Sequence, residues 1–572
     1  MKQFHFNYQN IALLRKELQK IKMWSSSAMT SHIVFQILTE ILDKKTIGAI
    51  CSEIEKELPE AEYFGCSTNG NIINGAFDGT PVSIVCTLFE YPSTKTEFFQ
   101  YELTAETSDL VAEDLLLKIS ERPWIKAVEL LTTIRGMSMT GFCEKLGKSS
   151  PDIQIFGGGA FNGQVDSDAA CVFSKQGGWL DRGVVFMLVG GNDFYVTSTY
   201  ITGWKPLGKY LRVTKAKGNI LYELDGEPAY SVYYKYLNIG NDLHFFTNSL
   251  EFPFFYEHNG ISLLRAPSSS NADGSLTMTS DIEENVTARL AYGDPWTILD
   301  SVKHEGQKIA DFCPEIIQIF SCAARRTFWG ISEISKESMP FQNAAPTSGF
   351  YTSGEFLRTD GFVNQHNVTL VVAGMREGEP MNKPVKMEVD TEDFAGSVSL
   401  ISRLANYINA AFHELEFIAL RDGMTKLFNR SESQRIITER LESGKPMSLV
   451  MLDIDNFKSV NDTFGHKEGD NVIIGLASLL KSIAVKQNGS AGRWGGEEFM
   501  LFLPYELETA EKTAGEICKG FSDICFEKAG HNTVSIGVTQ AIPDESVDTL
   551  LLRVDTALYE AKHTGKNRYV VK

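Results

Sequence analysis

The sequence predicts an α/β protein that consists of several domains. Its 572 residues exceed what one hydrophobic core usually serves, and at about 150 residues per domain they indicate three or four domains. Short apolar runs of strand length, such as residues 81–91 and 183–191, alternate with amphipathic helical patterns such as residues 30–45. Hydrophobic residues make up 43% and charged residues 22%, an ordinary globular balance.

Charge and cysteine content narrow the class of protein. The net charge of −19 argues against non-specific binding to a nucleic-acid backbone. It does not exclude a nucleotide, because a local Lys/Arg pair with a metal ion can hold a triphosphate on an acidic protein. The nine cysteines show no C-x-x-C spacing, which predicts a reducing compartment and structural thiols. The N-terminus has no apolar signal core, and no apolar run reaches about 18 residues. We expect a cytoplasmic protein without a membrane span or a nucleic-acid partner.

Two α/β domains are predicted in the first two thirds, at residues 30–202 and 203–375. In the first domain, the glycine-rich segments FGCSTNGNI (residues 64–72) and FGGGAFNG (residues 156–163) indicate tight loops at strand ends. In the second domain, residues 218–237 predict a strand, an Asp-Gly turn and a helix.

A polar, proline-containing linker is predicted at residues 376–393, and a helix at residues 394–420. Apolar residues in this helix are spaced by three and four, as in a heptad repeat: Ile401, Leu404, Ile408, Ala411, Leu415 and Ile418. One interpretation is an amphipathic helix that packs on a domain core. The other is a parallel coiled coil that pairs two chains, which the position directly before the last domain favours.

The last domain, residues 421–572, alternates helix and strand patterns. At the end of the apolar strand of residues 448–455, Asp453 and Asp455 are two residues apart, so their side chains share a face. Such carboxylates are costly against a core unless a cation is near, and a few oxygen ligands suit Mg²⁺. The plain alternative is a strand end that emerges into solvent.

Gly495 and Gly496 separate two β-type runs and predict a type I′ hairpin turn with positive φ at both glycines. Such a turn would hold Glu497 beside the strand end of Asp453. Together with Lys562 and Lys566 at the end of the last helix, these acids suit phosphoryl or nucleotidyl transfer. The alternative is an ordinary hairpin with surface carboxylates.

Four ordered motifs give the last domain a family resemblance. They are RDGMTKLFNR (421–430), LDIDNFKSVNDTFGHKEGD (452–470), RWGGEEF (493–499) and VDTALYEAKHTGKNR (554–568). The domain resembles the GGDEF family of diguanylate cyclases, in its GGEEF form. The resemblance implies a palm-like α/β domain with a central, mostly antiparallel sheet. It also implies that two GTP molecules are joined into cyclic di-GMP with release of two pyrophosphates. Each domain holds one GTP, so catalysis needs a homodimer, which the heptad helix can align.

The resemblance also assigns roles to single residues. Asp453 and Glu497 would bind Mg²⁺ or Mn²⁺ with help from the Ile454 carbonyl, and Glu497 would help to activate the 3′-hydroxyl. Glu498 would support the turn or a second metal.

The remaining residues with implied roles bind the substrate. Asn461 and Asp470 would recognise guanine. An Asp carboxylate accepts hydrogen bonds from the N1–H and the exocyclic amine of guanine, and adenine does not offer this pair of donors. The residues that match phosphate contacts are Phe457, Lys458, Lys562 and Lys566. Lys566 replaces a frequent arginine, which keeps the charge but loses the bidentate fork.

One family feature is missing. Many relatives carry an inhibitory product site, R-x-x-D, that ends six residues before the first glycine of the signature. Lys486 and Gly489 occupy these positions here. We therefore predict no inhibitory product site on this surface.

The first two thirds resemble the FIST N and FIST C sensory domains, on the glycine-rich segments above and on GEPAYSVYYKYL and TSGFYTSGEF. The resemblance implies a module that senses a small molecule such as an amino acid. Arg325, Arg326, Tyr351 and Glu355 are the candidates for a pocket that binds a zwitterion. The alternative is that the motifs contain only turn glycines and a surface ion pair. Cys66 has no companion histidine motif, which favours a buried thiol over a nucleophile.

Two further functions stay open at this point. The last domain could be a catalytically silent receptor for GTP or cyclic di-GMP that relays to a protein partner. Silent relatives usually lose the signature acids, which are all present here. A cyclase that makes an adenine-containing dinucleotide is disfavoured by Asp470.

Overall fold

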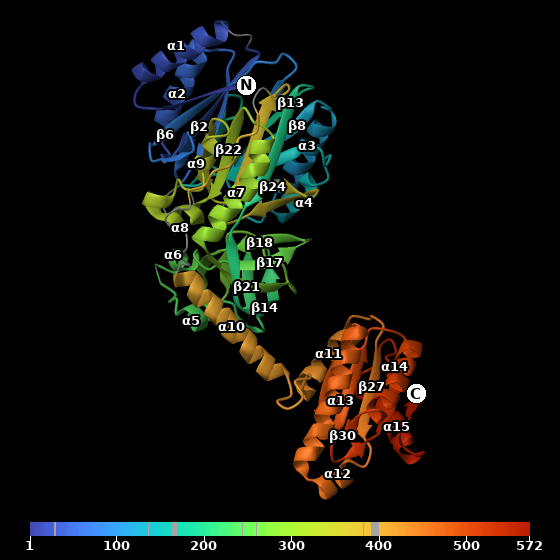
Figure 1. Cartoon of the computed structure of the whole chain (residues 1–572). Coiled ribbons are helices and arrows are strands. Elements are labelled where there is room, and N and C mark those ends of the chain that lie inside the picture. The colour runs from blue at the N-terminus through green and yellow to red at the C-terminus, as the bar shows by residue number, and fades with distance from the viewer. Residues whose placement is uncertain are drawn as a thin grey trace. The chain divides into compact units, whose positions relative to one another are not determined.

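The computed structural model describes residues 1–572 except 28–29, 135–136, 163–168, 243, 259, 381–382 and 391–399. The chain divides into two compact units, Met1–Ile408 and Asn409–Lys572 (Figure 1). Both units mix helices and sheets, which confirms the predicted α/β class. The predicted linker and the start of the predicted helix at 394 fall partly outside the described residues.

Three sheets of the N-terminal unit contain the same module. In each, a helical segment connects two parallel strands, and a later strand returns antiparallel beside the first. The modules are β2 (His32–Thr39), α2 (Lys44–Glu57), β3 (Glu62–Ser67) and β6 (Val82–Phe89); β8 (Ile125–Thr132), α4 (Thr140–Leu146), β9 (Gln154–Gly159) and β12 (Gly183–Gly190); and β22 (Ile316–Cys322), α8 (Ala323–Glu333), β23 (Thr347–Thr352) and β26 (Leu370–Glu377).

A glycine in the second strand of each module explains part of the glycine-rich motifs. A Cβ added at any of the three would lie about 2 Å from a carbonyl oxygen of the first strand, too close for any side chain. The pairs are Gly65 with Ile37 (2.1 Å), Gly157 with Leu130 (1.9 Å) and Gly349 with Ile319 (1.9 Å).

The three sheets share one core. Their inner faces contribute to a single buried cluster that includes Val34, Phe64, Ala127, Phe156, Phe320 and Phe350. Helices cover the outer faces: α1 (Ile11–Ser27) and α2 on the first, α3 (Ser108–Ser120) and α4 on the second, and α7 (Pro295–Asp311) and α8 on the third (Figure 1). The side-chain alternation of each strand therefore serves two separate hydrophobic clusters.

Strands from both predicted sensory domains build these sheets together. β24 (Glu355–Thr359) pairs with β9 and β25 (Phe362–His366) with β24, β13 (Phe194–Ile201) pairs with β26, and β4 (Asn71–Ile73) pairs with β23. The predicted boundary at residues 202 and 203 therefore runs through shared sheets instead of between separate cores.

A fourth sheet has its own core, which α5 and α6 complete. The elements not yet named in the N-terminal unit are β1 (Lys2–Asn7), β5 (Ala76–Asp78), β7 (Lys95–Glu102), β10 (Val172–Ser174), β11 (Gly178–Leu180), β14 (Trp204–Lys217), β15 (Ile220–Leu224), β16 (Glu227–Pro228), α5 (Tyr230–Leu237), α6 (Phe245–Ser249), β17 (Phe254–His258), β18 (Ile261–Arg265), β19 (Pro267–Ser270), β20 (Leu276–Met278), β21 (Thr287–Gly293) and α9 (Met339–Gln342).

One local prediction is wrong and one is confirmed. Residues 30–45 do not form an amphipathic helix; they contain β2, whose last six residues are all buried. An apolar run buried on both faces gives no strand alternation, so the helical pattern was accidental. The strand, turn and helix predicted at 218–237 are β15, a turn with positive φ at Asp225 (54°) and Gly226 (79°), and α5.

The C-terminal unit is a five-stranded sheet with helices on both faces. The strand order is β28-β29-β27-β32-β33, and only the β32–β33 pair is parallel, which confirms a mostly antiparallel sheet. Its elements are α11 (Arg430–Glu442), β27 (Ser448–Ile454), α12 (Phe457–Phe464), α13 (His466–Lys486), β28 (Ser490–Gly495), β29 (Glu498–Leu503), α14 (Leu507–Ser522), β30 (Cys525–Phe526), β31 (Gly530–His531), β32 (Val534–Gln540), α15 (Val547–His563) and β33 (Tyr569–Val571).

Helix α10 (Leu400–Leu420) carries the predicted heptad positions. Its start packs on the N-terminal unit: Ala405 is buried, and the Ser402 hydroxyl donates to Asp294 Oδ1 at 2.5 Å. The heptad side chains are largely exposed, and the exposed fraction reaches 66% at Leu415 and 70% at Ile418. An amphipathic helix packed on its own domain core would bury these positions. The coiled coil stays a prediction.

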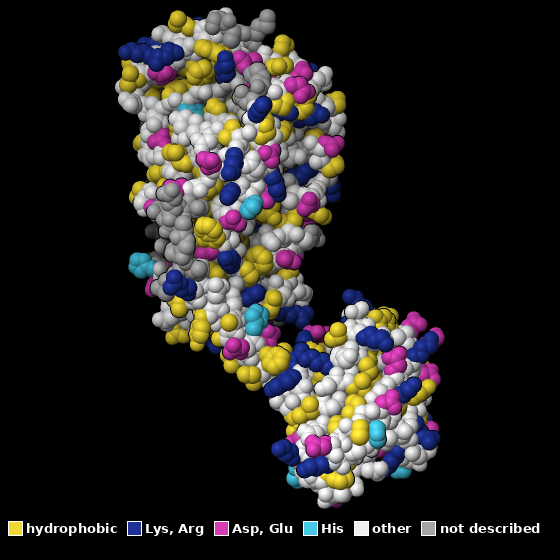
Figure 2. All heavy atoms as spheres, viewed as in Figure 1, with side chains coloured by type: hydrophobic (Ala, Val, Ile, Leu, Met, Phe, Trp, Pro, Cys, Tyr) yellow, Lys and Arg dark blue, Asp and Glu magenta, His cyan; other side chains and the backbone are white. Residues whose placement is uncertain are grey.

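No helix among the described residues is both long and apolar enough to cross a membrane. On the face shown in Figure 2, Lys and Arg side chains are interspersed with Asp and Glu on each unit. Neither unit presents a continuous basic surface on that face.

Candidate active site

Asp453 lies near the end of β27, where the strand meets the last helix of the chain. Its carboxylate is nearly buried, and Lys562 Nζ of α15 lies 2.7 Å from Asp453 Oδ2. Burial raises the pKa of Asp453 to about 6; Lys562 opposes this, and the nearby Glu497 and Glu498 add to it. The site therefore contains three carboxylates within electrostatic reach of one another and one lysine paired with the most buried of them.

The predicted hairpin connects β28 and β29, but its turn is displaced by one residue. Gly495 pairs with Glu498, so Gly496 and Glu497 are the central residues, and of the two glycines only Gly496 has positive φ (37°). The type I′ turn with positive φ at both glycines is therefore wrong. The juxtaposition that it was meant to produce is present: the N–H of Ile454 donates to the Glu497 carbonyl at 3.4 Å.

Arg493 fixes this turn. Its Nε and Nη2 donate to the Gly496 carbonyl at 2.9 and 2.7 Å, and its Nη1 forms an ion pair with Asp422 at 3.2 Å. Asp422 also accepts from the Thr425 backbone N–H and hydroxyl. The entry motif of the domain thus holds the segment that carries Glu497. The sequence showed both the entry motif (residues 421–430) and the RWGGEEF motif, but it did not show that the entry motif holds the turn of the second one in place.

Asp455 does not join Asp453 in the site. Its carboxylate is buried and accepts from the hydroxyls of Thr533 (2.7 Å) and Ser535 (2.6 Å) and from the N–H of Asn567 (2.9 Å). These donors tie β27 to β32 and to the loop after α15. Asp455 is a structural residue here, and Asp453 is the acid of this pair that faces Lys562.

The proposed guanine-reading residues lie on α12 and α13, which follow β27 directly. A Cβ on Gly469 would lie 2.0 Å from Asn461 Oδ1, so the glycine lets Asn461 lie against the backbone next to Asp470. Both Asn461 and Asp470 are partly exposed. The structure therefore places the Asn461 amide against the backbone of the residue before Asp470.

The proposed phosphate-binding residues surround the start of α12. Asn456, in the left-handed conformation (φ 56°), precedes Phe457, and the side chain of Lys458 is exposed. Lys566 Nζ donates to Asn456 Oδ1 at 2.6 Å. Backbone N–H groups at a helix start, together with Lys562 and Lys566, form a positive corner beside Asp453.

The donor set fits a divalent cation that is completed by substrate oxygens. Among the described residues, no group of three or more His, Cys, Asp and Glu side chains forms a complete protein cage for a metal. Mg²⁺ typically needs only one or two carboxylates plus phosphate oxygens and water. Asp453, with its raised pKa beside Glu497 and Glu498, is a carboxylate that a cation would stabilise.

The surface on which we predict no inhibitory product site has a structural reason for its glycine. A Cβ at Gly489 would lie 2.5 Å from the Phe502 carbonyl oxygen, so an aspartate does not fit there without a backbone shift. Lys486 forms an exposed ion pair with Glu516 at 3.2 Å.

In the N-terminal unit, the motifs of residues 64–72, 156–163 and 347–356 meet at one point. Backbone hydrogen bonds connect Phe161 N to the Ser67 carbonyl (2.9 Å), Asn69 N to the Tyr351 carbonyl (3.1 Å) and Ser353 N to the Gly159 carbonyl (3.1 Å). The carboxyl ends of the three parallel strand pairs therefore converge; Gly163 lies outside the described residues.

The sensory candidates are not arranged as a ligand pocket. Arg325 is fully buried; its Nε and Nη2 bind Glu337, and its Nη1 donates to the Thr202 and Val368 carbonyls. This correction has a physical reason: a fully buried guanidinium needs internal partners, and it has them.

The other sensory candidates have internal partners too. The Tyr351 hydroxyl lies 3.4 Å from the Ile334 carbonyl, and Glu355 accepts from the Thr352 and Thr369 hydroxyls at 2.6 and 2.7 Å. Arg326 donates to Asn69. Cys66 is buried, which raises its thiol pKa and agrees with a structural role.

Comparison with known families agrees with this architecture. Residues 419–568 match the family described as diguanylate cyclase, GGDEF domain. Residues 36–227 match the FIST N domain and residues 229–358 the FIST C domain. The chain thus carries a GGDEF domain preceded by FIST N and FIST C domains.

Several curated relatives are named diguanylate cyclases. DgcM of Escherichia coli K12 is 41% identical over 160 residues, which cover 27% of this chain and 39% of DgcM. VdcA of Vibrio cholerae is 33% identical over 196 residues, which cover 31% of this chain and 57% of VdcA. The chain therefore spans less than two thirds of either relative.

Solved structures also match. The coiled coil and GGDEF domain of DgcB from Caulobacter crescentus, in complex with c-di-GMP, is 32% identical; the match covers 30% of this chain and all of DgcB's solved chain, with a TM-score of 0.28. The active GGEEF domain of a diguanylate cyclase from Vibrio cholerae is 34% identical, over 25% of this chain and 92% of that chain, with a TM-score of 0.23.

Proposed function

We propose that the protein is a signal-regulated diguanylate cyclase that converts two GTP molecules into cyclic di-GMP and two pyrophosphates. The observation that carries the proposal is the corner at the end of β27, where Asp453 forms an ion pair with Lys562 and interacts electrostatically with Glu497 of the adjacent hairpin turn. The relatives named diguanylate cyclase support the same reaction class.

In the proposed reaction, the 3′-hydroxyl of one GTP attacks the α-phosphorus of the other. A phosphorus–oxygen bond forms, the bond to pyrophosphate breaks, and the proton of the 3′-hydroxyl passes to solvent water. A second, reciprocal step closes the ring and releases the second pyrophosphate. Asp453 and Glu497, with the Ile454 carbonyl, would hold Mg²⁺ or Mn²⁺, which neutralises phosphate charge and activates the hydroxyl. Glu497 lies in the braced turn, where it would orient the attacking hydroxyl.

The other residues bind and position GTP. Asn461 and Asp470 would read the guanine edge, which favours GTP over ATP. Lys562, Lys566 and the start of α12, with Phe457 and Lys458, would bind the phosphates.

Reaction between two GTP molecules held on separate domains requires two chains that face each other. The exposed apolar positions of α10 support a parallel homodimer that sets this alignment. Ligand binding in the FIST region would then act on the catalytic pair through α10, whose start is hydrogen-bonded to Asp294.

Incubation of the full chain with GTP and Mg²⁺, followed by mass spectrometry of the products, tests this proposal. Cyclic di-GMP and pyrophosphate are expected in a 1:2 ratio, which is the stoichiometry of two condensations. GTP binding without any product from the dimer would instead support the second candidate, a silent receptor. A product that contains adenine from a GTP and ATP mixture would contradict the role of Asp470.

A further inference from the structure

The turn that follows α15 carries Lys566, which the proposed function assigns to the phosphates of GTP, and the backbone of this turn is unusual. Lys566 and Asn567 both have positive φ, at 61° and 46°. Asn456, the residue before α12, also has positive φ, at 56°. Asparagine tolerates this conformation, but lysine rarely adopts it, and such residues persist only where surrounding contacts hold them. The turn therefore depends on contacts from outside itself.

Asp455 makes one of these contacts. It is 5% exposed, and its Oδ2 accepts from the backbone N–H of Asn567 at 2.9 Å and from the Thr533 hydroxyl at 2.7 Å. Its Oδ1 accepts from the Ser535 hydroxyl at 2.6 Å. A carboxylate has room for all three donors, and hydrogen bonds to a charged acceptor are the strong ones. The hydroxyls on the β32 side thus fix the carboxylate, and the carboxylate fixes the backbone of the turn.

Asn456 makes a second contact with the same turn. Lys566 Nζ donates to Asn456 Oδ1 at 2.6 Å. Lysine carries its charge on a flexible four-carbon stem, so an ammonium group without a partner samples many positions. The bond to Asn456 keeps this ammonium group beside the start of α12, where the first backbone N–H groups of the helix also attract anions. Asn456 therefore holds the charge of the turn, and Asp455 holds its backbone.

Both contacts come from the segment that also carries the proposed metal ligand. Asp455 and Asn456 follow Asp453 and Ile454 directly in the chain. Lys562, on the last turn of α15, forms an ion pair with Asp453 at 2.7 Å. One short stretch of backbone therefore sets the distance between the acid at the end of β27 and the turn after α15. Reactions that depend on orientation lose rate when such distances change by about 1 Å.

We propose that Asp455 and Asn456 are positioning residues of the candidate active site. They hold the turn of Lys566 and Asn567 so that Lys566 meets the β- and γ-phosphates of GTP, and neither of them contacts the substrate. The inference rests on the proposed function for the assignment of Lys566 to phosphate. It deepens that function, which gives no role to either residue.

The test measures how the full chain binds two probes in the presence of Mg²⁺. One is α,β-methylene-GTP, in which a methylene bridge replaces the bond that the proposed reaction breaks, so the probe is not consumed. Calorimetry gives its affinity. The other is GMP, which lacks the β- and γ-phosphates and is measured by competition with the analogue. A loss that affects the analogue alone reports on the phosphate-binding turn, whereas a general distortion of the site weakens both.

Asp455→Ala should weaken binding of the analogue about tenfold, and Asn456→Gly about threefold, and both should leave GMP binding unchanged. Glycine suits position 456 because it adopts positive φ without strain. The matched control is Glu545→Gln. The Glu545 side chain is 5% exposed and pairs with Arg553 at 2.7 Å, so this variant loses a structural acid of the same unit. It should bind both probes like wild type.

Unchanged analogue binding in either variant would overturn the inference, and so would an equal loss of analogue and GMP binding. Asn456→Gly combined with Lys566→Ala should bind the analogue as Lys566→Ala does; a further threefold loss would show that Asn456 does not act through Lys566. If Asp455→Ala does not fold, Asn456→Gly decides alone. The predicted binding pattern without cyclic di-GMP from GTP rejects the proposed reaction only. Cyclic di-GMP synthesis with unchanged analogue binding in both variants rejects the inference only.

Discussion

Glu129 makes the stability of the N-terminal unit depend on pH. It lies on β8, is fully buried, and accepts from Gln36 Nε2 at 2.8 Å. Burial raises its pKa from 4.5 to about 8, against the opposing hydrogen bonds of Gln318 and Gln36. The folded protein thus keeps a proton on Glu129 at a pH where the unfolded chain has released it.

The sign and size of the effect follow from this shift. Because the folded pKa is raised, the stabilisation is complete below about pH 4.5 and is lost as the pH rises to about 8. Each pH unit in this window lowers the free energy of unfolding by about 1.4 kcal/mol. Between about pH 5.5 and 7.5 the loss from this residue is therefore on the order of 2 to 3 kcal/mol. Glu129→Gln, which is neutral at every pH, removes it.

Urea unfolding at these two pH values, followed by near-UV circular dichroism, measures the effect. The decrease in unfolding free energy between the two pH values should be smaller in Glu129→Gln than in wild type by roughly 2 to 3 kcal/mol. Glu60→Gln, at an exposed position, should behave like wild type. An equal pH dependence in wild type and Glu129→Gln would refute the reasoning.

Three further predictions concern the catalytic unit. Arg493→Lys keeps the charge but loses the two guanidinium hydrogen bonds to the turn, so turnover should fall about tenfold, and Arg493→Ala should lower it about a hundredfold. The KM for GTP should change little in both variants. Steady-state assays measure this, and an unchanged turnover rate would contradict the bracing role of Arg493. The double substitution Leu415→Glu and Ile418→Glu should convert the dimer to a monomer in analytical ultracentrifugation and abolish cyclic di-GMP synthesis. Glu414→Gln, at an exposed position of the same helix, should do neither. An active monomer would contradict the pairing role of α10. Low micromolar cyclic di-GMP should leave turnover unchanged; inhibition that Lys486→Ala relieves would show that the product surface is functional.

The sequence was most informative where local pattern and chemistry agree. In the C-terminal unit, the family resemblance implied the mostly antiparallel sheet. The glycine pair and the apolar strand before Asp453 predicted that Glu497 lies beside the end of that strand, and the backbone of Glu497 does contact Ile454 there. The turn itself was displaced, because Gly495 still pairs with Glu498 and only Gly496 takes positive φ. Local composition does not show which of two adjacent glycines ends a strand.

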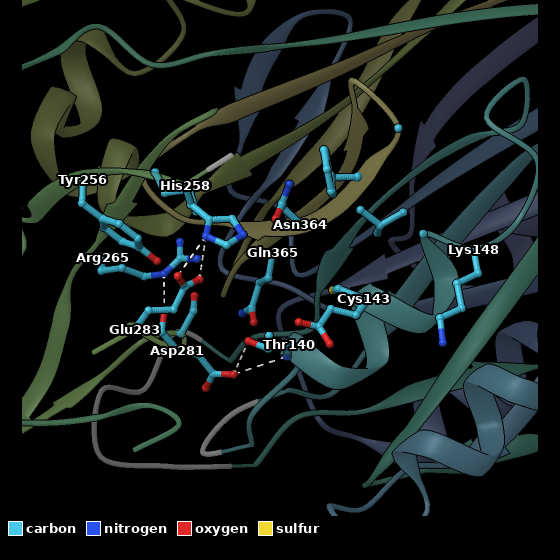
Figure 3. Close-up of a pocket in the computed structure, with 17 residues that line it drawn as sticks. Thr140, Cys143, Lys148, Tyr256, His258, Arg265, Asp281, Glu283, Asn364 and Gln365 are labelled. Carbon is cyan, nitrogen blue, oxygen red and sulfur yellow. Dashed lines mark hydrogen bonds and ion pairs between the residues drawn. The ribbon is translucent and has the colours of Figure 1, made fainter. Parts of the chain in front are cut away.

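The N-terminal unit was less predictable because its strand order depends on pairing between strands that are far apart in the sequence. A strand buried on both faces, β2, has the apolar content of a helix. Arg325 and Glu355 are residue types that often occur in ligand sites. In the fold, Arg325 is paired with carbonyl groups such as that of Thr202, 123 residues away, and Glu355 with the Thr369 hydroxyl, so both are structural. A cavity of about 390 Å³ between α4 and β25 (Figure 3) unites residues more than 200 positions apart, such as Thr140 and Gln365, and no sequence spacing links them.

The rate of cyclic di-GMP formation from GTP and Mg²⁺ by Glu497→Gln, beside wild type and the exposed control Glu527→Gln, tests the central claim most directly. Wild type and the control are expected to form cyclic di-GMP at similar rates, and Glu497→Gln at least about a hundredfold more slowly. Full activity in Glu497→Gln, or no cyclic di-GMP from the wild-type dimer, would contradict the assignment of this corner as the catalytic site.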